Sequence, residues 1–191
     1  MKDTRFYALI SRMKYITRWS LMRNAVGENI QEHSHMVAVI AHALGVIGNR
    51  IYGKHYNPEH LATVAMFHDA TEILTGDMPT PIKYYNPDIK VAYKQVERIA
   101  GERLLQMLPP ELAECYTDLI LEEDEEIAAI VKAADKLSAY IKCVEEQKAG
   151  NTEFDSAEVT TMQAMLKMDR PELGWFIENC LEPFRLNLDQ L

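Results

Sequence analysis

Residues 67–72 read Phe67-His68-Asp69-Ala70-Thr71-Glu72, and this stretch decides how the rest of the chain is interpreted. It ends an apolar segment with helical spacing, so we expect His68 and Asp69 at the edge of a hydrophobic core. A carboxylate buried beside an imidazole is costly unless something compensates its charge, and a divalent metal ion is the usual compensation. The stretch therefore predicts a metal site, provided that other segments supply further ligands.

Helical spacing of apolar residues continues on both sides of this stretch. We expect helices over residues 3–16, 29–52 and 87–108, and from the acidic run 122–126 to about Gln147. Proline at a first helical position marks three more starts, at Asn57-Pro58, Pro109-Pro110 and Arg170-Pro171. Residues 17–24 and 75–81 lack an apolar period and are expected to be loops. No strand pattern appears, so the prediction is an all-α fold with residues 1–191 in a single domain.

The composition limits the classes of function. A net charge of −9 argues against nucleic-acid binding through a broad basic face, but it permits a small phosphorylated substrate. No apolar run approaches the roughly 20 residues that cross a bilayer, and no export signal is recognisable at the start. Three widely spaced cysteines are then expected to be free thiols. We expect a cytoplasmic protein without a membrane or nucleic-acid partner.

Two further polar residues are predicted to face the core. On the helix 29–52, His33 falls on the apolar face, whereas His35 and His42 fall on the opposite face. On the helix that ends near Gln147, Asp135 lies against an apolar stripe. Together with the adjacent His68 and Asp69, called the HD pair below, they give two imidazoles and two carboxylates. Such a set is suited to a divalent ion. Four protein ligands leave room on an octahedral metal for water and a substrate oxygen, which favours catalysis.

The two predicted loops are the other candidate regions. Arg18 and Trp19 lie in the first loop, near Lys14 and Arg23, and this basic group is either a solvated surface or part of a site. The loop 75–81 follows the HD pair so closely that it should pass any site there. The alternative is that it is only a connector.

The order of His33, the His68-Asp69 pair and Asp135 on helices resembles the HD-domain superfamily of metal-dependent phosphohydrolases. More closely, the chain resembles the bacterial 5′-deoxynucleotidases nearly from end to end. The matching segments are residues 16–19, Glu28-Asn29, Glu32-His33-Ser34, 42–44, 68–72, 74–84, 132–135 and 139–143. An isolated HD pair would be weak, but Arg18-Trp19 and the Thr-Gly-Asp-Met-Pro-Thr-Pro loop make the resemblance specific. His35 departs from the apolar residue expected after His33-Ser34, on a face that points away from the site.

The resemblance implies an HD-domain helical bundle that forms a homodimer. It implies hydrolysis of deoxyribonucleoside 5′-monophosphates, with selection against ribonucleotides and 3′-phosphates. One divalent ion, whether Co²⁺, Mn²⁺, Zn²⁺ or Mg²⁺, would be bound by His33, His68, Asp69 and Asp135. Glu72 and Arg18 carry over as catalytic residues. The implied substrate contacts are Arg18, Trp19, His33, Asp69, Asp77, Met78, Pro79, Thr80 and Asp135.

Elementary chemistry agrees with these implied roles. Glu72 can transfer a proton, and Arg18 can bind two phosphate oxygens at once. Trp19 beside the sugar would exclude a 2′-hydroxyl by its bulk, or it could simply anchor its loop to the core. Asp77 could accept a hydrogen bond from the 3′-hydroxyl.

Other functions share this ligand set. HD triphosphohydrolases and cyclic-nucleotide phosphodiesterases use it, and a metal-bound regulatory protein without catalysis is also compatible with it.

Overall fold

The computed structural model describes residues 4–83, 85–122 and 124–191; Tyr84, Glu123 and the side chain of Thr80 lie outside this description. The prediction of an all-α fold is confirmed. The regular elements of the described residues are helices, and one isolated β-bridge joins Thr17 to Asn29. The α-helices are α1 (Phe6–Ile10), α2 (Ile30–Tyr52), α3 (Pro58–Phe67), α4 (Glu72–Thr75), α5 (Thr80–Lys83), α6 (Pro87–Leu105), α7 (Pro110–Ile120), α8 (Glu125–Lys148), α9 (Asp155–Leu166) and α10 (Pro171–Cys180).

Short 3₁₀ helices complete the set: η1 (Met13–Tyr15), η2 (Thr152–Phe154), η3 (Glu182–Arg185) and η4 (Leu188–Gln190). Among the described residues, none of the helices combines the length and the apolar character needed to cross a bilayer.

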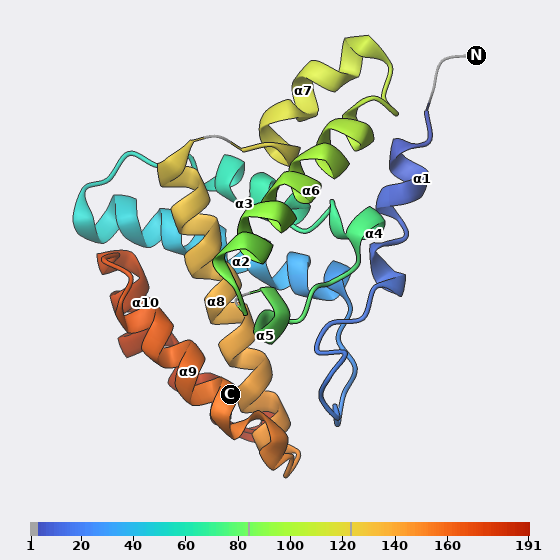
Figure 1. Cartoon of the computed structure of the whole chain (residues 1–191). Helices are drawn as coiled ribbons and strands as arrows, with labels where there is room; N and C mark the ends of the chain where they lie inside the picture. The colour runs from blue at the N-terminus through green and yellow to red at the C-terminus, as the bar shows by residue number, and fades with distance from the viewer. Residues whose placement is uncertain (1–3, 84, 123) are drawn as a thin grey trace.

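The long helices α2 and α8 cross at the centre of the molecule and carry most of the main core (Figure 1). Asn29 caps α2: its side chain accepts hydrogen bonds from the backbone N–H groups of Gln31 and Glu32, both at 3.0 Å. Gly45 lets α3 approach α2 closely, because a Cβ there would lie 2.8 Å from Leu61 Cδ1. This close approach brings the end of α3, where the HD pair lies, beside the start of α2.

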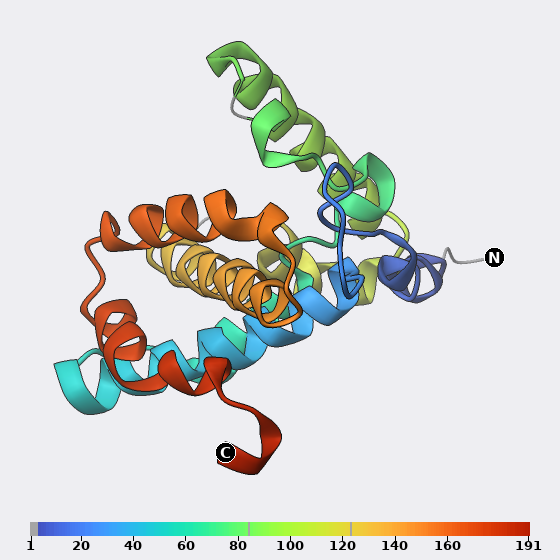
Figure 2. The same cartoon turned by 90° about the horizontal axis from the view of Figure 1, so that it is seen from below.

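A second, smaller core lies under α1 and α7 and contains Phe6, Ala70, Leu104, Met107 and Leu108. Ala70 is fully buried in it, so the residue that follows the HD pair anchors that stretch to the body of the protein. Figure 2 shows α6 projecting away from the layer formed by α2, α8, α9 and α10.

Four sequence expectations need correction. The predicted helix 3–16 is two short helices, α1 and η1, separated at Ser11 and Arg12. The Ser11 hydroxyl donates a hydrogen bond to the carbonyl of Ala8 at 2.8 Å, and such local side-chain bonds compete with helix continuation. The loop predicted over residues 75–81 is shorter than expected, because α4 ends at Thr75 and α5 begins at Thr80. The helix that leads into the HD pair ends at Phe67, and Glu72 begins the separate helix α4 after a turn.

The fourth correction concerns α9, which the sequence did not predict. Its apolar residues do not gather on one face, and Met165 is its one buried residue. The helix therefore lacks the amphipathic pattern from which helices are predicted. The helix expected to start within the acidic run does start there: Asp124 caps α8, accepting hydrogen bonds from the N–H groups of Glu126 and Ile127.

Candidate active site

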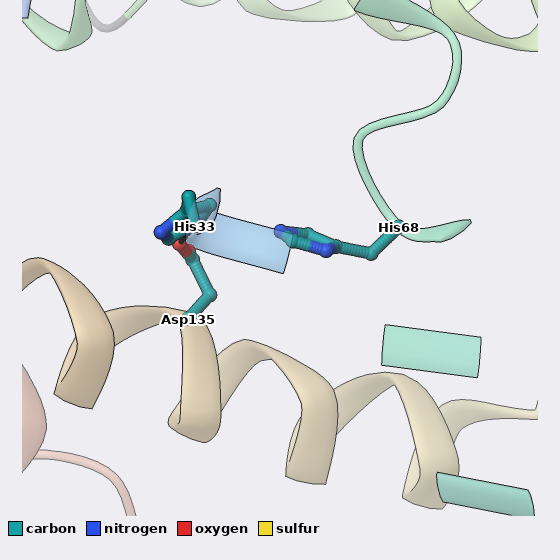
Figure 3. A group of neighbouring side chains, drawn as sticks. All are labelled: His33, His68 and Asp135. Atoms are coloured by element: carbon teal, nitrogen blue, oxygen red, sulfur yellow. Dashed lines mark hydrogen bonds and ion pairs between the residues drawn. The ribbon is translucent and has the colours of Figure 1, made fainter. Parts of the chain in front are cut away.

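Three of the four predicted metal ligands meet between α2, α8 and the turn after α3 (Figure 3). The ligand atoms of His33, His68 and Asp135 all lie within 4.8 Å of one another. His33 is fully buried, and its Nε2 lies 3.1 Å from Asp135 Oδ1. The helical wheel therefore placed His33 and Asp135 on the correct faces, and His35 and His42 are exposed on the opposite side of α2.

Asp69, the fourth predicted ligand, borders this group. Its Oδ2 lies 3.2 Å from His68 Nε2 and 3.7 Å from His33 Nε2. The same oxygen accepts a hydrogen bond from Arg18 Nη1 at 3.3 Å. The turn at residues 68–71 is what lets two consecutive side chains, His68 and Asp69, reach one site.

Neighbouring groups orient both imidazoles. His33 Nδ1 lies 3.1 Å from Ser138 Oγ, and His68 Nδ1 lies 2.7 Å from the carbonyl oxygen of Ala65. A carbonyl can only accept, so Nδ1 of His68 carries a proton, and in the neutral ring Nε2 keeps the lone pair that a metal ligand needs. That Nε2 is buried and has no hydrogen-bond partner within the described part of the chain. A buried nitrogen in this state fits a metal ligand, and the bonds at Nδ1 are the outer-shell contacts that such ligands make.

The charges of the site depend on one another. Burial by itself raises the pKa of Asp69, but His68, His33 and Arg18 outweigh it and lower that pKa to about 2. Burial likewise opposes ionisation of Asp135, yet the hydrogen bond and charge of His33 hold its pKa well below the usual range. Burial lowers the pKa of His68 while Asp69 raises it, and the net direction is upward. Both carboxylates are therefore ionised and available to a cation.

Arg18 and Trp19 reach the site from the loop between η1 and α2, and Glu28 holds both. Glu28 Oε2 accepts from Arg18 Nε at 3.1 Å and from Trp19 Nε1 at 2.9 Å. The side chain of Arg18 is 13% exposed, whereas that of Arg23 is 92% exposed and pairs with Glu153. The basic group seen in the sequence is therefore divided: Arg18 belongs to the site, and Arg23 to the surface.

Trp19 adopts a backbone φ of 59°, in the left-handed region that non-glycine residues rarely occupy. Its ring packs at 5.2 Å, centroid to centroid, on that of Phe154. The hydrogen bond to Glu28 and the packing on Phe154 hold this conformation. Backbone strain of this kind concentrates at functional sites.

Glu72 faces the same site from the start of α4. It is 7% exposed, and its Oε2 has no hydrogen-bond partner within the described residues. Burial, followed by the charges of Asp69 and Asp77, raises the pKa of Glu72 to about 9. In the metal-free protein it therefore carries a proton near neutral pH, unlike Asp69.

These side chains line a cleft of about 460 Å³, a volume typical of small-molecule sites. The predicted residues that line it are Arg18, Trp19, Asp69, Glu72, Asp77, Met78, Pro79 and Asp135. His33 and His68 are not among its lining residues, and the side chain of Thr80 lies outside the described part.

The cleft also has walls that the sequence interpretation did not identify. The additional lining residues are Ser20, Leu21, Met22, Pro81, Lys83, Lys136, Ala139, Glu153, Ser156, Ala157, Thr160 and Thr161. Those from Ser156 onward belong to α9, and without that helix the far wall could not be predicted. Lys136 follows Asp135 directly, and that adjacency was the available signal for it.

Comparison with known proteins gives concordant results. A model of the family described as 5′-deoxynucleotidase YfbR-like matches residues 5–184. A 5′-deoxynucleotidase of Vibrio vulnificus (strain YJ016) is 45% identical over 193 residues, which cover 100% of both chains.

Solved structures agree on the fold. An HD-domain phosphohydrolase from Listeria innocua matches with a TM-score of 0.77 at 21% identity, over 94% of this chain and 88% of that one. The HD phosphohydrolase DatZ of cyanophage S-2L, solved with dA and one catalytic Zn²⁺ ion, matches with a TM-score of 0.65 at 22% identity. The DatZ match covers 92% of this chain and 95% of that one. The fold is therefore that of the HD-domain phosphohydrolases.

Proposed function

The chain belongs to the YfbR-like family of 5′-deoxynucleotidases, and from this premise we propose that it hydrolyses deoxyribonucleoside 5′-monophosphates to a deoxynucleoside and phosphate. The observation that carries the proposal is the cleft itself. It is lined by the partly buried carboxylates of Asp69 and Asp135, by Glu72 and by Arg18, and its volume suits one small phosphorylated molecule.

His33, His68, Asp69 and Asp135 are the residues that would hold a divalent ion, and their mixture of nitrogen and oxygen donors suits Co²⁺, Mn²⁺, Zn²⁺ or Mg²⁺. When bound, such an ion makes water more acidic and polarises a phosphoryl oxygen. The unpartnered Nε2 of His68 supports this ligand set.

Arg18 binds the phosphate in this proposal. Its guanidinium is fixed by Glu28 and Asp69, so it meets the substrate already oriented. Lys136 supplies a second cation, because it lines the cleft and forms no ion pair within the described part of the chain. Lys83, the other lysine of the cleft, is bonded to Glu97 at 2.9 Å. Glu72 transfers the proton, and its raised pKa suits donation to the leaving 5′-oxygen.

Selection among sugars is assigned to the two loops. Both Trp19 and Asp77 line the cleft. In this proposal the bulk of Trp19 excludes a 2′-hydroxyl, and Asp77 accepts a hydrogen bond from the 3′-hydroxyl. Met78, Pro79 and Thr80 complete the loop that contacts the substrate. His33 is fully buried and does not line the cleft, so its proposed role is that of a metal ligand and not of a direct substrate contact.

The proposal extends to the whole chain. Residues 1–191 form one functional domain, consistent with a relative that matches over the full length of both chains. A homodimer is proposed from the exposed apolar side chains of the projecting α6, Val91, Val96 and Ile99. A cytoplasmic location is consistent with three free cysteines. Light scattering and cell fractionation test these two points.

The deciding experiment is phosphate release from dAMP, AMP, 3′-dAMP and dATP, with the protein loaded in turn with each of the four metals. We expect turnover of dAMP, with little release from the other three. Preferential attack on dATP would indicate a triphosphohydrolase instead, and no release with any metal would indicate a regulatory protein.

A further inference from the structure

The loop that carries Arg18 and Trp19 has a closed base and a second anchor far from it. At the base, the N–H of Arg18 donates to the carbonyl of Glu28 at 2.9 Å, and the N–H of Ile30 donates to Ile16 at 3.0 Å. Residues 17–29 between these bonds, here called the recognition loop, contain no fully buried side chain. Burial of the loop's own side chains therefore does not fix its position.

The second anchor is a buried ion pair near the end of α8. Lys142 and Glu146 are 4% and 1% exposed, and they lie one helical turn apart. Lys142 Nζ donates to Glu146 Oε1 and also to the backbone carbonyl of Val26. Figure 1 shows the loop descending beside this half of α8.

The side chain of Glu146 binds backbone groups of the recognition loop. Its carboxylate accepts from the N–H of Ala25 at 2.7 Å and from the N–H of Val26 at 3.2 Å. Asn151 completes the arrangement by donating to Glu146 Oε2 and to the carbonyl of Arg23, both at 2.7 Å. Burial by itself raises the pKa of Glu146, but Lys142 and these donors lower it to about 2, so the carboxylate stays charged.

The same group supports Trp19 from beneath. Lys142 Nζ lies 5.7 Å from the ring centroid of the fully buried Phe154. Phe154 in turn packs on Trp19, whose φ of 59° requires support. The Trp19 ring therefore has two defined partners, Glu28 at Nε1 and the ring of Phe154.

A buried ion pair is a poor means of raising stability, because apolar residues of similar size usually serve as well or better. Apolar residues could not, however, satisfy two loop N–H groups and a loop carbonyl. We therefore assign to the Lys142–Glu146 pair the role of holding a polar loop in place.

We propose that Glu146, with Lys142, is a positioning residue for substrate recognition: it holds the recognition loop so that Arg18 and Trp19 face the cleft. This inference rests on the proposed function for its substrate and on the loop contacts for its mechanism. Glu146 is remote from the reacting groups and acts through the loop alone.

The test is Glu146→Gln, which removes the charge but keeps the shape, with Glu145→Gln on the exposed side of the same helix as the matched control. Both are made in a Trp175→Phe background, so that Trp19 is the remaining tryptophan. Four quantities are measured: metal content, kcat and KM for dAMP, the dAMP-to-AMP ratio of kcat/KM, and acrylamide quenching of Trp19 fluorescence.

In Glu146→Gln we expect KM for dAMP to rise roughly tenfold or more, as for a weakened set of buried charged hydrogen bonds. We expect a narrower dAMP-to-AMP ratio and stronger quenching of Trp19, with metal content and kcat close to those of the control. Asn151→Ala removes the two hydrogen bonds to Glu146 and Arg23 and the cap on the Glu153 N–H, but it leaves the Lys142–Glu146 pair in place. It should change KM and quenching in the same direction, and it covers the case in which Glu146→Gln does not fold.

The proposal would be overturned if Glu146→Gln and Asn151→Ala fold and differ from the Glu145→Gln control only in a lower Tm, with the same KM and the same quenching. Glu146 would then be merely structural. Absence of dAMP turnover in the parent would refute the proposed function instead. The quenching measurement would then decide the loop anchor by itself.

Discussion

Glu72→Gln separates the electrostatics of the site from its chemistry. In the metal-free protein, Glu72 has a folded-state pKa of about 9, raised by burial and by Asp69 and Asp77, against an ordinary value of 4.5. The unfolded chain therefore loses this proton near its ordinary pKa, whereas the folded protein keeps it to a much higher pH. Because the folded state binds more protons in that interval, its stability falls as the pH rises.

The size of the effect follows from the interval. Each pH unit between the two pKa values lowers the free energy of unfolding by about 1.4 kcal/mol, so the change from about pH 5 to about pH 8 is at most about 4 kcal/mol. Glutamine resembles the protonated acid and does not titrate. Glu72→Gln should match the parent near pH 5 and be more stable near pH 8 by up to that amount.

Urea unfolding of chelator-treated protein at both pH values measures the difference, with the exposed Glu114→Gln as control. An equal difference between parent and Glu72→Gln at the two pH values would refute the reasoning, because Glu72 would then be ionised in the folded state. With metal restored, the same variant should retain the ion and lose about 10²–10⁴-fold in kcat. A loss of only a few-fold would reduce Glu72 to a supporting residue.

Three further substitutions test the other assignments. Asp69→Ala should abolish activity and metal retention, because it removes a partly buried carboxylate that lies near both imidazoles; full metal occupancy by elemental analysis would contradict this. Arg18→Lys should lower kcat/KM for dAMP by about tenfold, since a point charge replaces a two-pronged donor; parental kinetics would return Arg18 to the solvated surface. Trp19→Ala should narrow the dAMP-to-AMP ratio by roughly 10–200-fold; an equal loss on both substrates would show that Trp19 only anchors its loop.

The sequence predicted best where a long helix repeats its apolar period without interruption. His33 and Asp135 lie on such helices, α2 and α8, so the wheel gave their faces correctly. The position of Glu72 was less predictable, because the turn after Phe67 is fixed by the burial of Ala70 in a second core that no local pattern announces. The far wall of the cleft was missed together with α9.

The support of the site was the least predictable part, because it depends on hydrogen bonds between residues far apart in sequence. Glu146 and Ala25 are separated by 121 positions, and neither has a pattern that pairs it with the other. A Lys–Glu pair one turn apart on a helix usually indicates a solvated surface pair. Only the fold shows that this pair is buried beneath a loop.

Trp19 joins the two interpretations that the sequence left open. Its contacts with Glu28 and Phe154 make it an anchor, and its place among the lining residues makes it a wall of the cleft. One residue can serve both purposes because its Nε1 is bonded to Glu28 while the residue also lines the cleft. Loss of stability in Trp19→Ala is therefore compatible with either role. Only the dAMP-to-AMP ratio of kcat/KM tests whether Trp19 is a wall of the cleft, because loss of a mere anchor would leave that ratio unchanged.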